Sequence, residues 1–265
     1  MKAFFTGILA VVCFVVLVLG NVSWNAKIKD AGANATANEQ SSTEGTIQSE
    51  KPKMEVQASE LAEYISNWPE QSQDVFKQKL ANGEPFKIVL AGSSAIANEK
   101  FSLEEALQRS IEKTFGSSIE LSAVTFDVTS TEFVAKGHEQ DLIDLNADMI
   151  IFEALTLRDN GLVVIEDSHK NISAIMQAVT DENPNTSFIL QPPPPLFTAN
   201  FYPKQVAELK KYAEGNDITY LDYWSSYPAE GTADRALYFT ESQDALNEDG
   251  YALWSSYVED YIISK

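Results

Sequence analysis

Five short apolar runs alternate with helical patterns along most of this chain, and this alternation is the strongest constraint on its fold. The runs have the length and composition of buried strands, and they cover about 86–91, 119–128, 149–154, 187–191 and 218–221. Helical patterns follow them at 102–115, at 132–145, from 167, at 203–214 and at 249–263. Strands that are each followed by a helix predict a three-layer α/β/α fold, with a doubly wound, mostly parallel five-stranded sheet of the flavodoxin-like type.

Polar residues follow the predicted strands. The carboxyl ends of parallel strands share one edge of the sheet, where ligand sites of open α/β sheets usually lie. The candidates at this edge are Ser93, Ser94, Thr129 to Thr131, Glu153, Asp159, Asn160, Asp167, His169, Gln191, Asp222 and Trp224. We therefore expect the functional residues to lie among them.

The most informative of these residues stand in Gly92-Ser93-Ser94, directly after the first strand. A glycine at a strand end permits a sharp turn, and the serine after it is held at the edge of the sheet. This arrangement suits a nucleophilic serine. The alternative is an ordinary strand-to-helix loop whose serines cap a helix or fill a turn.

Charge and composition exclude several functions. The 265 residues carry a formal net charge of -20, which argues against nucleic-acid binding because phosphate contacts need clustered lysines and arginines. The only cysteine is Cys13, and the chain has two histidines. We therefore expect no disulfide, no cofactor and no zinc site of the usual His/Cys type in the folded domain.

The N-terminal part is expected to lie at a membrane. Residues 1–24 contain an uncharged apolar run at 4–20, and we interpret them as a transmembrane signal anchor; a cleaved signal peptide is the alternative. Residues 25–57 are polar and are expected to form a disordered tether. Residues 58–265 would then form a domain outside the cell membrane, or a secreted domain if the signal is cleaved.

The domain resembles the SGNH or GDSL hydrolase family, which has a three-layer α/β/α fold, over about 86–263. Gly92-Ser93-Ser94 is similar to the family's Gly-Asp-Ser block, which implies that Ser94 is the nucleophile. The segment that ends in Asn160 is similar to the family's Gly-x-Asn-Asp block, which implies that Asn160 is an oxyanion donor.

The family's last block, which carries a histidine shortly before the final helix, is altered here. When the chain is aligned on Asn247 and Gly250, the two positions at which family members keep histidine hold Ala245 and Tyr251. Asp244, a candidate catalytic residue, stands nearby without its usual partner. Without histidine the serine lacks its ordinary base, and tyrosine is a poor replacement because its pKa is near 10.

Two replacements for the base are open. His169 is expected in the first turn of the helix that begins near Asp167, on the side of the site; otherwise it is an exposed surface residue. The second replacement is a carboxylate from Glu153, Asp159 or Asp222, although acids at strand ends more often cap backbone groups.

Two functions therefore compete. The first is a membrane-tethered extracellular hydrolase or acyltransferase for acyl esters of an envelope glycan or lipid, in which Asn160 and backbone N–H groups near Ser94 and Ser130 bind the oxyanion. The second is a weak or inactive domain that binds an envelope glycan or a partner protein. Its candidate aromatic contacts are Tyr202, Trp224, Tyr227 and Trp254. A dinucleotide-binding domain is disfavoured because no G-x-G-x-x-G follows the first strand.

Overall fold

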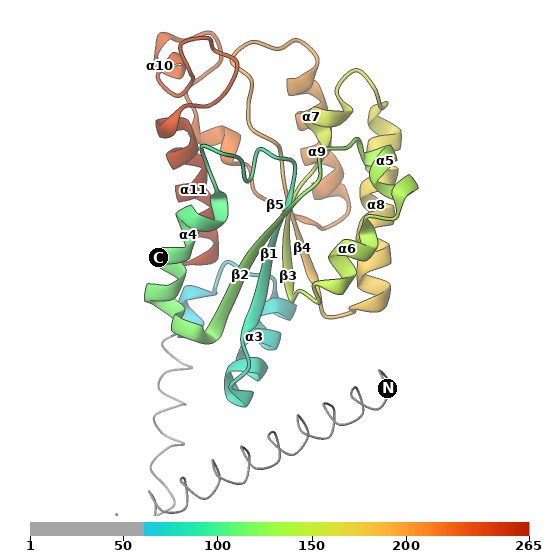
Figure 1. The fold of residues 1–265 in the computed structure, drawn as a ribbon, viewed down its shortest axis with the longest axis vertical. Helices are drawn as coiled ribbons and strands as arrows, with labels where there is room; N and C mark the ends of the chain where they lie inside the picture. Colours follow the sequence, from blue (N-terminus) through green and yellow to red (C-terminus); the bar gives the residue numbers. More distant parts are fainter. Residues whose placement is uncertain (1–60, 265) are drawn as a thin grey trace, which may run out of the picture. The chain divides into compact units, whose positions relative to one another are not determined.

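The computed structural model describes residues 61–264, which contain a five-stranded parallel sheet (Figure 1). In space the strands follow the order β2-β1-β3-β4-β5. Their bounds are Phe86–Gly92 for β1, Ile119–Thr125 for β2, Met149–Glu153 for β3, Ser187–Gln191 for β4 and Thr219–Tyr220 for β5. Every residue of β3 and β4 is buried, as expected for strands that are covered on both faces.

Helices cover both faces of the sheet. One face carries α3 (Glu70–Asn82), α4 (Leu103–Phe115) and α11 (Glu248–Ile262). The other face carries α5 (Ser130–Lys136), α6 (Glu139–Asp144), α8 (Ile165–Glu182) and α9 (Tyr202–Gly215). Ile88 and Leu90 of β1 point into the first core, while Val89 and Ala91 point into the second, as the two-residue repeat of a strand requires.

The predicted α/β/α fold is confirmed, and two predicted elements differ from the structure. Strand β2 ends at Thr125 rather than at 128, and the helix expected at 132–145 is divided into α5 and α6. The division lies at Gly137, whose left-handed backbone with a φ of 71° ends the first helix. Shorter helical segments fill the connections: η1 (Gly116–Ser118), α7 (Thr156–Asp159), η2 (Tyr223–Ser226) and α10 (Ala233–Ala236).

Two predictions for the N-terminal part lie outside the described residues: the membrane anchor at 1–24 and the polar tether at 25–57. Within residues 61–264, no helix is both long enough and apolar enough to cross a membrane. The anchor and the tether therefore stay predictions from the sequence.

The side chain of Glu153, at the end of β3, joins this strand to the end of β1. Its Oε2 accepts hydrogen bonds from the backbone N–H of Ser93 at 3.1 Å and from the Ser93 hydroxyl at 2.9 Å. The Ser93 Oγ accepts a further bond from the N–H of Ala95 at 3.2 Å. Together these bonds fix the turn that carries Ser94.

Gly92 makes this close approach of the two strand ends possible. A Cβ at position 92 would lie 2.5 Å from the Cβ of Glu153 and 3.0 Å from its Oε2. Gly92 is not among the glycines with positive φ. The sequence suggested glycine for a sharp turn, but the structure requires it because there is no space for a side chain.

Glu153 is completely buried, and this burial raises its pKa from the ordinary value of 4.5 to about 8, although the hydrogen bonds from Ser93 act in the opposite direction. Its second oxygen, Oε1, has no hydrogen-bond partner among the described residues. Burying a charge costs free energy unless hydrogen bonds or an opposite charge compensate it. We therefore assign the neutral form to Glu153 at pH 7.

The close contact predicts that Gly92→Ala lowers the free energy of unfolding by about 1 to 3 kcal/mol, because the added methyl group would overlap Glu153. Gly215→Ala in α9 is the matched control. Its Cβ would meet nothing within 4 Å, so its effect is neutral or slightly stabilising. Urea denaturation of both variants makes the comparison, and equal stabilities would contradict the packing argument.

The buried carboxyl predicts that stability falls as the pH rises from about 4.5 to about 8, because over this interval the group ionises in the unfolded chain but stays protonated in the folded one. The total loss is on the order of 5 kcal/mol and levels off above this interval. Glu153→Gln keeps a side-chain oxygen that can accept the hydrogen bonds from Ser93. It removes the ionisable group and with it this loss of stability. Urea denaturation at several pH values checks it, and a parallel pH dependence in both proteins would disprove the neutral carboxyl.

Candidate functional site

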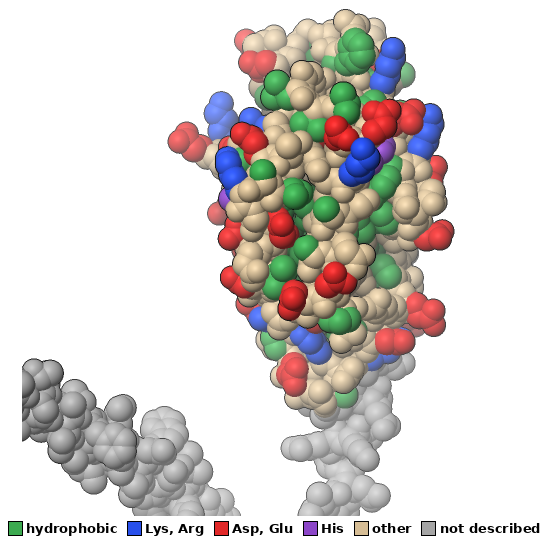
Figure 2. Space-filling model, turned by 90° about the vertical axis from the view of Figure 1, so that its right-hand side faces the viewer, with side chains coloured by type: hydrophobic (Ala, Val, Ile, Leu, Met, Phe, Trp, Pro, Cys, Tyr) green, Lys and Arg blue, Asp and Glu red, His purple; other side chains and the backbone are tan. Residues whose placement is uncertain are grey.

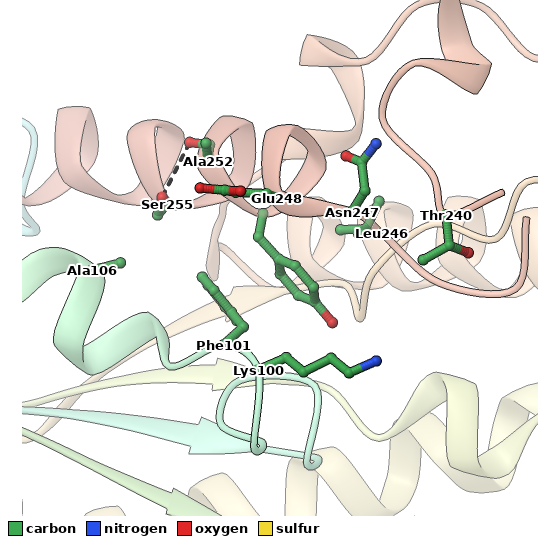
Figure 3. Close-up of a pocket in the computed structure, with 10 residues that line it drawn as sticks. Lys100, Phe101, Ala106, Thr240, Leu246, Asn247, Glu248, Ala252 and Ser255 are labelled. Carbon is green, nitrogen blue, oxygen red and sulfur yellow. Dashed lines mark hydrogen bonds between the residues drawn. The ribbon is translucent and has the colours of Figure 1, made fainter.

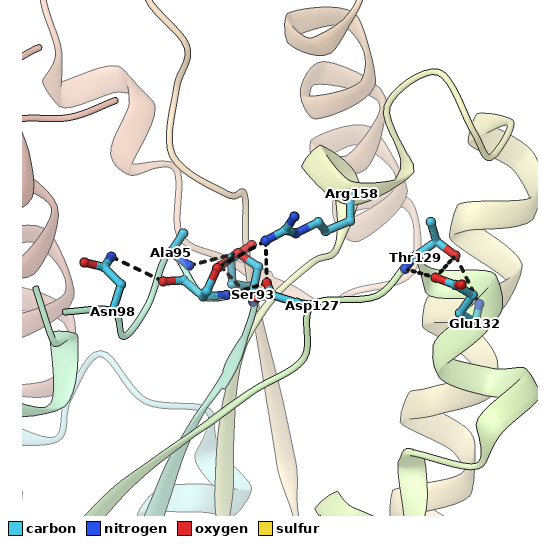
Figure 4. Close-up of polar contacts among 9 residues, drawn as sticks. Ser93, Ala95, Asn98, Asp127, Thr129, Glu132 and Arg158 are labelled. Atoms are coloured by element: carbon cyan, nitrogen blue, oxygen red, sulfur yellow. Dashed lines mark hydrogen bonds and ion pairs between the residues drawn. The ribbon is translucent and has the colours of Figure 1, made fainter. Parts of the chain in front are cut away.

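Ser94 is half-buried at the carboxyl edge of the sheet, two residues after β1. Its neighbours Asp127 and Arg158 are labelled in Figure 4. Its backbone N–H donates to Oδ1 of Asp127 at 3.1 Å, and its hydroxyl accepts a bond from the guanidinium of Arg158 at 3.1 Å. Arg158 and Asp127 also form an ion pair. A hydroxyl, a carboxylate and a guanidinium from three different connections therefore meet at this point, and we call them the Ser94 cluster.

The Asp127 carboxylate of this cluster is a weak base. Its partial burial acts to raise the pKa, but hydrogen bonds from the backbone and hydroxyl of Ser94 and the charge of Arg158 hold the pKa below its ordinary value of 3.8. An acid with a lowered pKa holds a transferred proton poorly, which makes it less suited than histidine to general-base catalysis near neutral pH.

Asp159, the last residue of α7, ties the first residue of α5 and the first turn of α8 to α7. It is fully buried, its Oδ1 accepts a bond from the N–H of Ser130 at 2.7 Å, and its Oδ2 accepts one from the hydroxyl of Ser168 at 2.6 Å. Backbone N–H groups near Ser94 and Ser130 were expected to bind an oxyanion. In the structure, the N–H groups of these two serines each donate to a carboxylate.

Asn160, the expected oxyanion amide, directly follows α7. Its half-buried side chain makes no hydrogen bond within residues 61–264. Arg158, two residues earlier, is the residue of this segment that contacts Ser94. The structure therefore brings the predicted segment to the serine, but through a guanidinium rather than through the amide.

Neither histidine contacts Ser94 in the described part of the chain. His169 lies in the second turn of α8, because this helix begins at 165, and its ring stacks on Tyr212 with the ring centroids 4.7 Å apart. Burial lowers the pKa of His169. The ring of His169 therefore packs on α9, which carries Tyr212. The other histidine, His138, forms a hydrogen bond with Asp141 through its Nδ1 at 2.8 Å.

The three carboxylates considered as bases are engaged elsewhere. Glu153 and Asp159 bond to the loop residues described above, and Asp222 pairs with a lysine of α9 at 2.8 Å. The carboxylate beside Ser94 is Asp127, which the sequence did not single out. The missed signal was the end of β2: with the strand ending at 125, position 127 falls at the edge of the sheet.

Asp244, in the loop before α11, accepts hydrogen bonds from the hydroxyls of Thr240 and Ser242, both at 2.8 Å. These bonds lower its pKa. The next residue is Ala245, so Asp244 has no histidine at that position to orient. In this structure Asp244 stabilises the loop that carries it.

Tyr251, at the other position where the family keeps histidine, lies in α11. Its ring stacks on Phe101 with the centroids 4.0 Å apart. Burial raises the pKa of Tyr251, although a hydrogen bond with Asn98 acts in the opposite direction. The Asn98 amide donates to the carbonyl of Ser94 at 3.3 Å. Tyr251 is thus linked to the backbone of the serine through Asn98.

The aromatic residues considered as ligand contacts belong largely to the core. Tyr202, Tyr227 and Trp254 are buried. Trp224 is half-buried and donates its indole N–H to the carbonyl of Pro193 at 2.9 Å. These side chains stabilise the fold and offer little surface to a ligand.

The Ser94 cluster is suited to polar recognition. The side chain of Arg158 is 42% exposed, and its guanidinium can donate further hydrogen bonds to an ester or phosphate oxygen. Within residues 61–264, no group of three or more His, Cys, Asp or Glu side chains could hold a metal ion. The groups that the Ser94 cluster offers to a ligand are the hydroxyl of Ser94, the ionised carboxylate of Asp127 and the guanidinium of Arg158.

Comparison with known proteins shows which fold this chain shares. No protein-family model and no curated protein matches the sequence. Solved structures do match: a GDSL-like lipase from Parabacteroides merdae has a TM-score of 0.54 at 12% identity and covers 67% of this chain and 95% of its own. A G-D-S-L family lipolytic protein from Desulfitobacterium hafniense has a TM-score of 0.53 at 17% identity, covering 66% and 98%.

A third similar structure is the lipase/acylhydrolase from Enterococcus faecalis, with a TM-score of 0.51 at 14% identity over 67% of this chain and 95% of its own. At these identities the likeness concerns the fold. It agrees with the resemblance seen in the sequence blocks around Ser94 and Asn160. The chain has the α/β/α fold of the SGNH/GDSL hydrolases.

Proposed function

We propose that this chain binds an acyl ester of a cell-envelope glycan or lipid at Ser94 without catalysing its hydrolysis. One observation carries the proposal: the N–H groups of Ser94 and Ser130 donate to Asp127 and Asp159. An acyl-transfer site needs donors aimed at the place where the oxyanion forms, and removing one such donor typically costs about a hundredfold or more in rate. Carboxylates in this position would also repel a developing negative charge.

The state of the serine supports the same conclusion. A serine hydroxyl attacks an ester only when a base takes its proton. Here the hydroxyl accepts a bond from the guanidinium of Arg158, and the neighbouring Asp127 has a lowered pKa. Ser94 and Arg158 can still hold a carbonyl or phosphate oxygen through hydrogen bonds.

The proposed place of action is outside the cell membrane. The apolar run at 4–20 and the polar stretch at 25–57 support a signal anchor with a tether that holds the domain away from the lipid. The net charge of -20 fits a ligand other than nucleic acid, and Figure 2 shows acidic side chains spread over the face that it draws.

A second candidate function is slow ester hydrolysis or acyl transfer by Ser94, with Asp127 as the base and Arg158 as the oxyanion donor. The hydrogen bond from the Ser94 hydroxyl that helps to lower the pKa of Asp127 favours it, because a base must reach the proton that it takes. Histidine is not required in this arrangement.

We predict that a fluorophosphonate probe does not label Ser94 in the full chain, and that wild type and Ser94→Ala hydrolyse p-nitrophenyl acetate at the same background rate. An intact serine hydrolase in the same mixture controls for probe quality. The physical reason is the lack of an activated hydroxyl, since loss of a triad member typically removes about four orders of magnitude in rate.

Labelling that disappears in Ser94→Ala would support the second candidate instead. In that case Asp127→Asn should reduce the Ser94-dependent rate by about a hundredfold or more, because the base is lost. Asp74→Asn, an exposed aspartate of α3, is the matched control and should leave the rate unchanged.

A further inference from the structure

Two Asn-Gly pairs occur in the chain, Asn82-Gly83 and Asn160-Gly161. An asparagine before glycine can lose its side-chain amide, because the glycine nitrogen carries no neighbouring Cβ that would hinder its approach to the side-chain carbon. Both glycines have a positive φ, 71° for Gly83 and 78° for Gly161, and a Cβ at either position would meet nothing within 4 Å. The two pairs therefore share sequence and glycine conformation, and they differ in their hydrogen bonds.

The pair at 82 and 83 ends helix α3. The N–H of Gly83 donates to the carbonyl of Leu80 at 3.2 Å, and the N–H of Glu84 donates to the carbonyl of Lys79 at 2.9 Å. These bonds belong to a helix end with a left-handed glycine. The nitrogen of Gly83 is thus held in the helix end, and its proton is engaged.

The pair at 160 and 161 lies in the connection between α7 and α8, just after Arg158 (Figure 1). The N–H of Leu162 donates to the carbonyl of Asp159 at 2.9 Å. With a φ of -57° and a ψ of 115° at Asn160, this bond closes a type II turn. Within residues 61–264, neither the N–H of Gly161 nor the side chain of Asn160 makes a hydrogen bond. Both reacting groups are therefore free.

The turn also permits the movement that the reaction needs. At a ψ of 115° the Gly161 nitrogen points away from the Asn160 side chain, so the peptide group between these residues must rotate. A type I turn keeps the same closing hydrogen bond and brings the nitrogen nearer to the side chain. In the described part of the chain, this rotation breaks no hydrogen bond of the peptide group, whereas freeing the Gly83 nitrogen breaks its bond to Leu80.

Asn247 shows the opposite situation to that of Asn160. It lines the cleft between α4 and the start of α11 (Figure 3). Its amide donates to two backbone carbonyls, and its side-chain oxygen accepts the N–H of Gly250. The residue after it is Glu248 rather than glycine. Three hydrogen bonds thus fix this side chain, while the side chain of Asn160 has none.

We propose that Asn160 is a site of spontaneous deamidation in the folded protein. Hydroxide takes the proton of the Gly161 N–H, and the nitrogen forms a bond to Cγ of Asn160. The bond between Cγ and Nδ2 breaks, and the leaving group takes a proton from water and departs as ammonia, which restores the hydroxide. Water then opens the cyclic imide at either of its carbonyl carbons and gives aspartate or isoaspartate.

The modification changes the segment that carries Arg158. Aspartate adds one negative charge to a chain whose net charge is already -20. Isoaspartate adds the same charge and also places an extra methylene group in the main chain between α7 and α8. Because Arg158 contacts Ser94 from this segment, both products change the surroundings of the Ser94 cluster. The reaction needs no ligand at Ser94, so it goes beyond the proposed function.

Peptide mapping by mass spectrometry tests this proposal on the full chain in lipid nanodiscs. The protein is incubated at mildly alkaline pH, and the conversion of both Asn-Gly pairs to aspartate and isoaspartate is followed over time. Asn82-Gly83 is the matched control in the same molecule. We expect conversion at Asn160 to be about fivefold faster or more than at Asn82, which is the factor that one protein hydrogen bond contributes.

The same chain in concentrated urea provides a second control. Urea removes both the turn and the helix end, so the two pairs should then react at similar rates. Asn160→Gln should stop conversion at this position and leave conversion at Asn82 unchanged, because a glutamine would have to close a larger and less favourable ring. Equal rates in the folded chain, faster conversion at Asn82 or no conversion at Asn160 would overturn the proposal. A rate ratio in urea equal to that of the folded chain would attribute the difference to flanking sequence and overturn the structural argument.

Discussion

A buried, neutral carboxyl group holds the functional edge of this sheet together. Glu153 bonds to both the backbone and the hydroxyl of Ser93, and the absence of a side chain at Gly92 lets the ends of β1 and β3 approach. The position of Ser94 follows from these contacts. Because Oε1 of Glu153 is buried without a partner, the arrangement is most stable while the group stays protonated.

Carboxylates also occupy the donors that a hydrolase would offer to its substrate. The backbone N–H groups that donate to side-chain carboxyl oxygens at this edge are those of Ser93, Ser94, Thr129 and Ser130; the acceptor of Ser93 is the neutral Glu153. Their partners stand in a chain with a net charge of -20. Within residues 61–264 no histidine contacts Ser94, and the N–H groups of Ser94 and Ser130 are engaged by aspartates. These two observations are the basis for the proposed recognition of an ester without its cleavage.

The fold was predictable because each buried strand and each helical stripe leaves its own repeat in the sequence. The place of Ser94 at the edge of the sheet was also predictable, since it follows directly after the end of β1. The partners of Ser94 were not: Asp127 was hidden by a strand predicted three residues too long, and Arg158 reaches the serine through the orientation of α7. Such orientations are set by tertiary packing, which leaves no periodic signal.

The role of His169 shows the same limit. Its place near the start of α8 was predicted within a few residues, but the choice between Ser94 and Tyr212 as its neighbour depends on how α8 packs on α9. Gly92 was likewise identified, although its reason lies in Glu153, 61 positions later in the chain. Sequence reasoning therefore located the edge of the sheet and the serine, and the structure supplied the contacts that decide the chemistry.

Amide hydrogen exchange at Ser94 and Ser130, measured by NMR, tests the central claim most directly. We predict that both N–H groups are protected in the wild-type chain, because each donates to a carboxylate. Asp127→Ala should accelerate exchange at Ser94 and leave Ser130 unchanged. Rapid exchange at Ser94 in the wild type, equal to that in Asp127→Ala, would show that this donor is free for an oxyanion and would contradict the account.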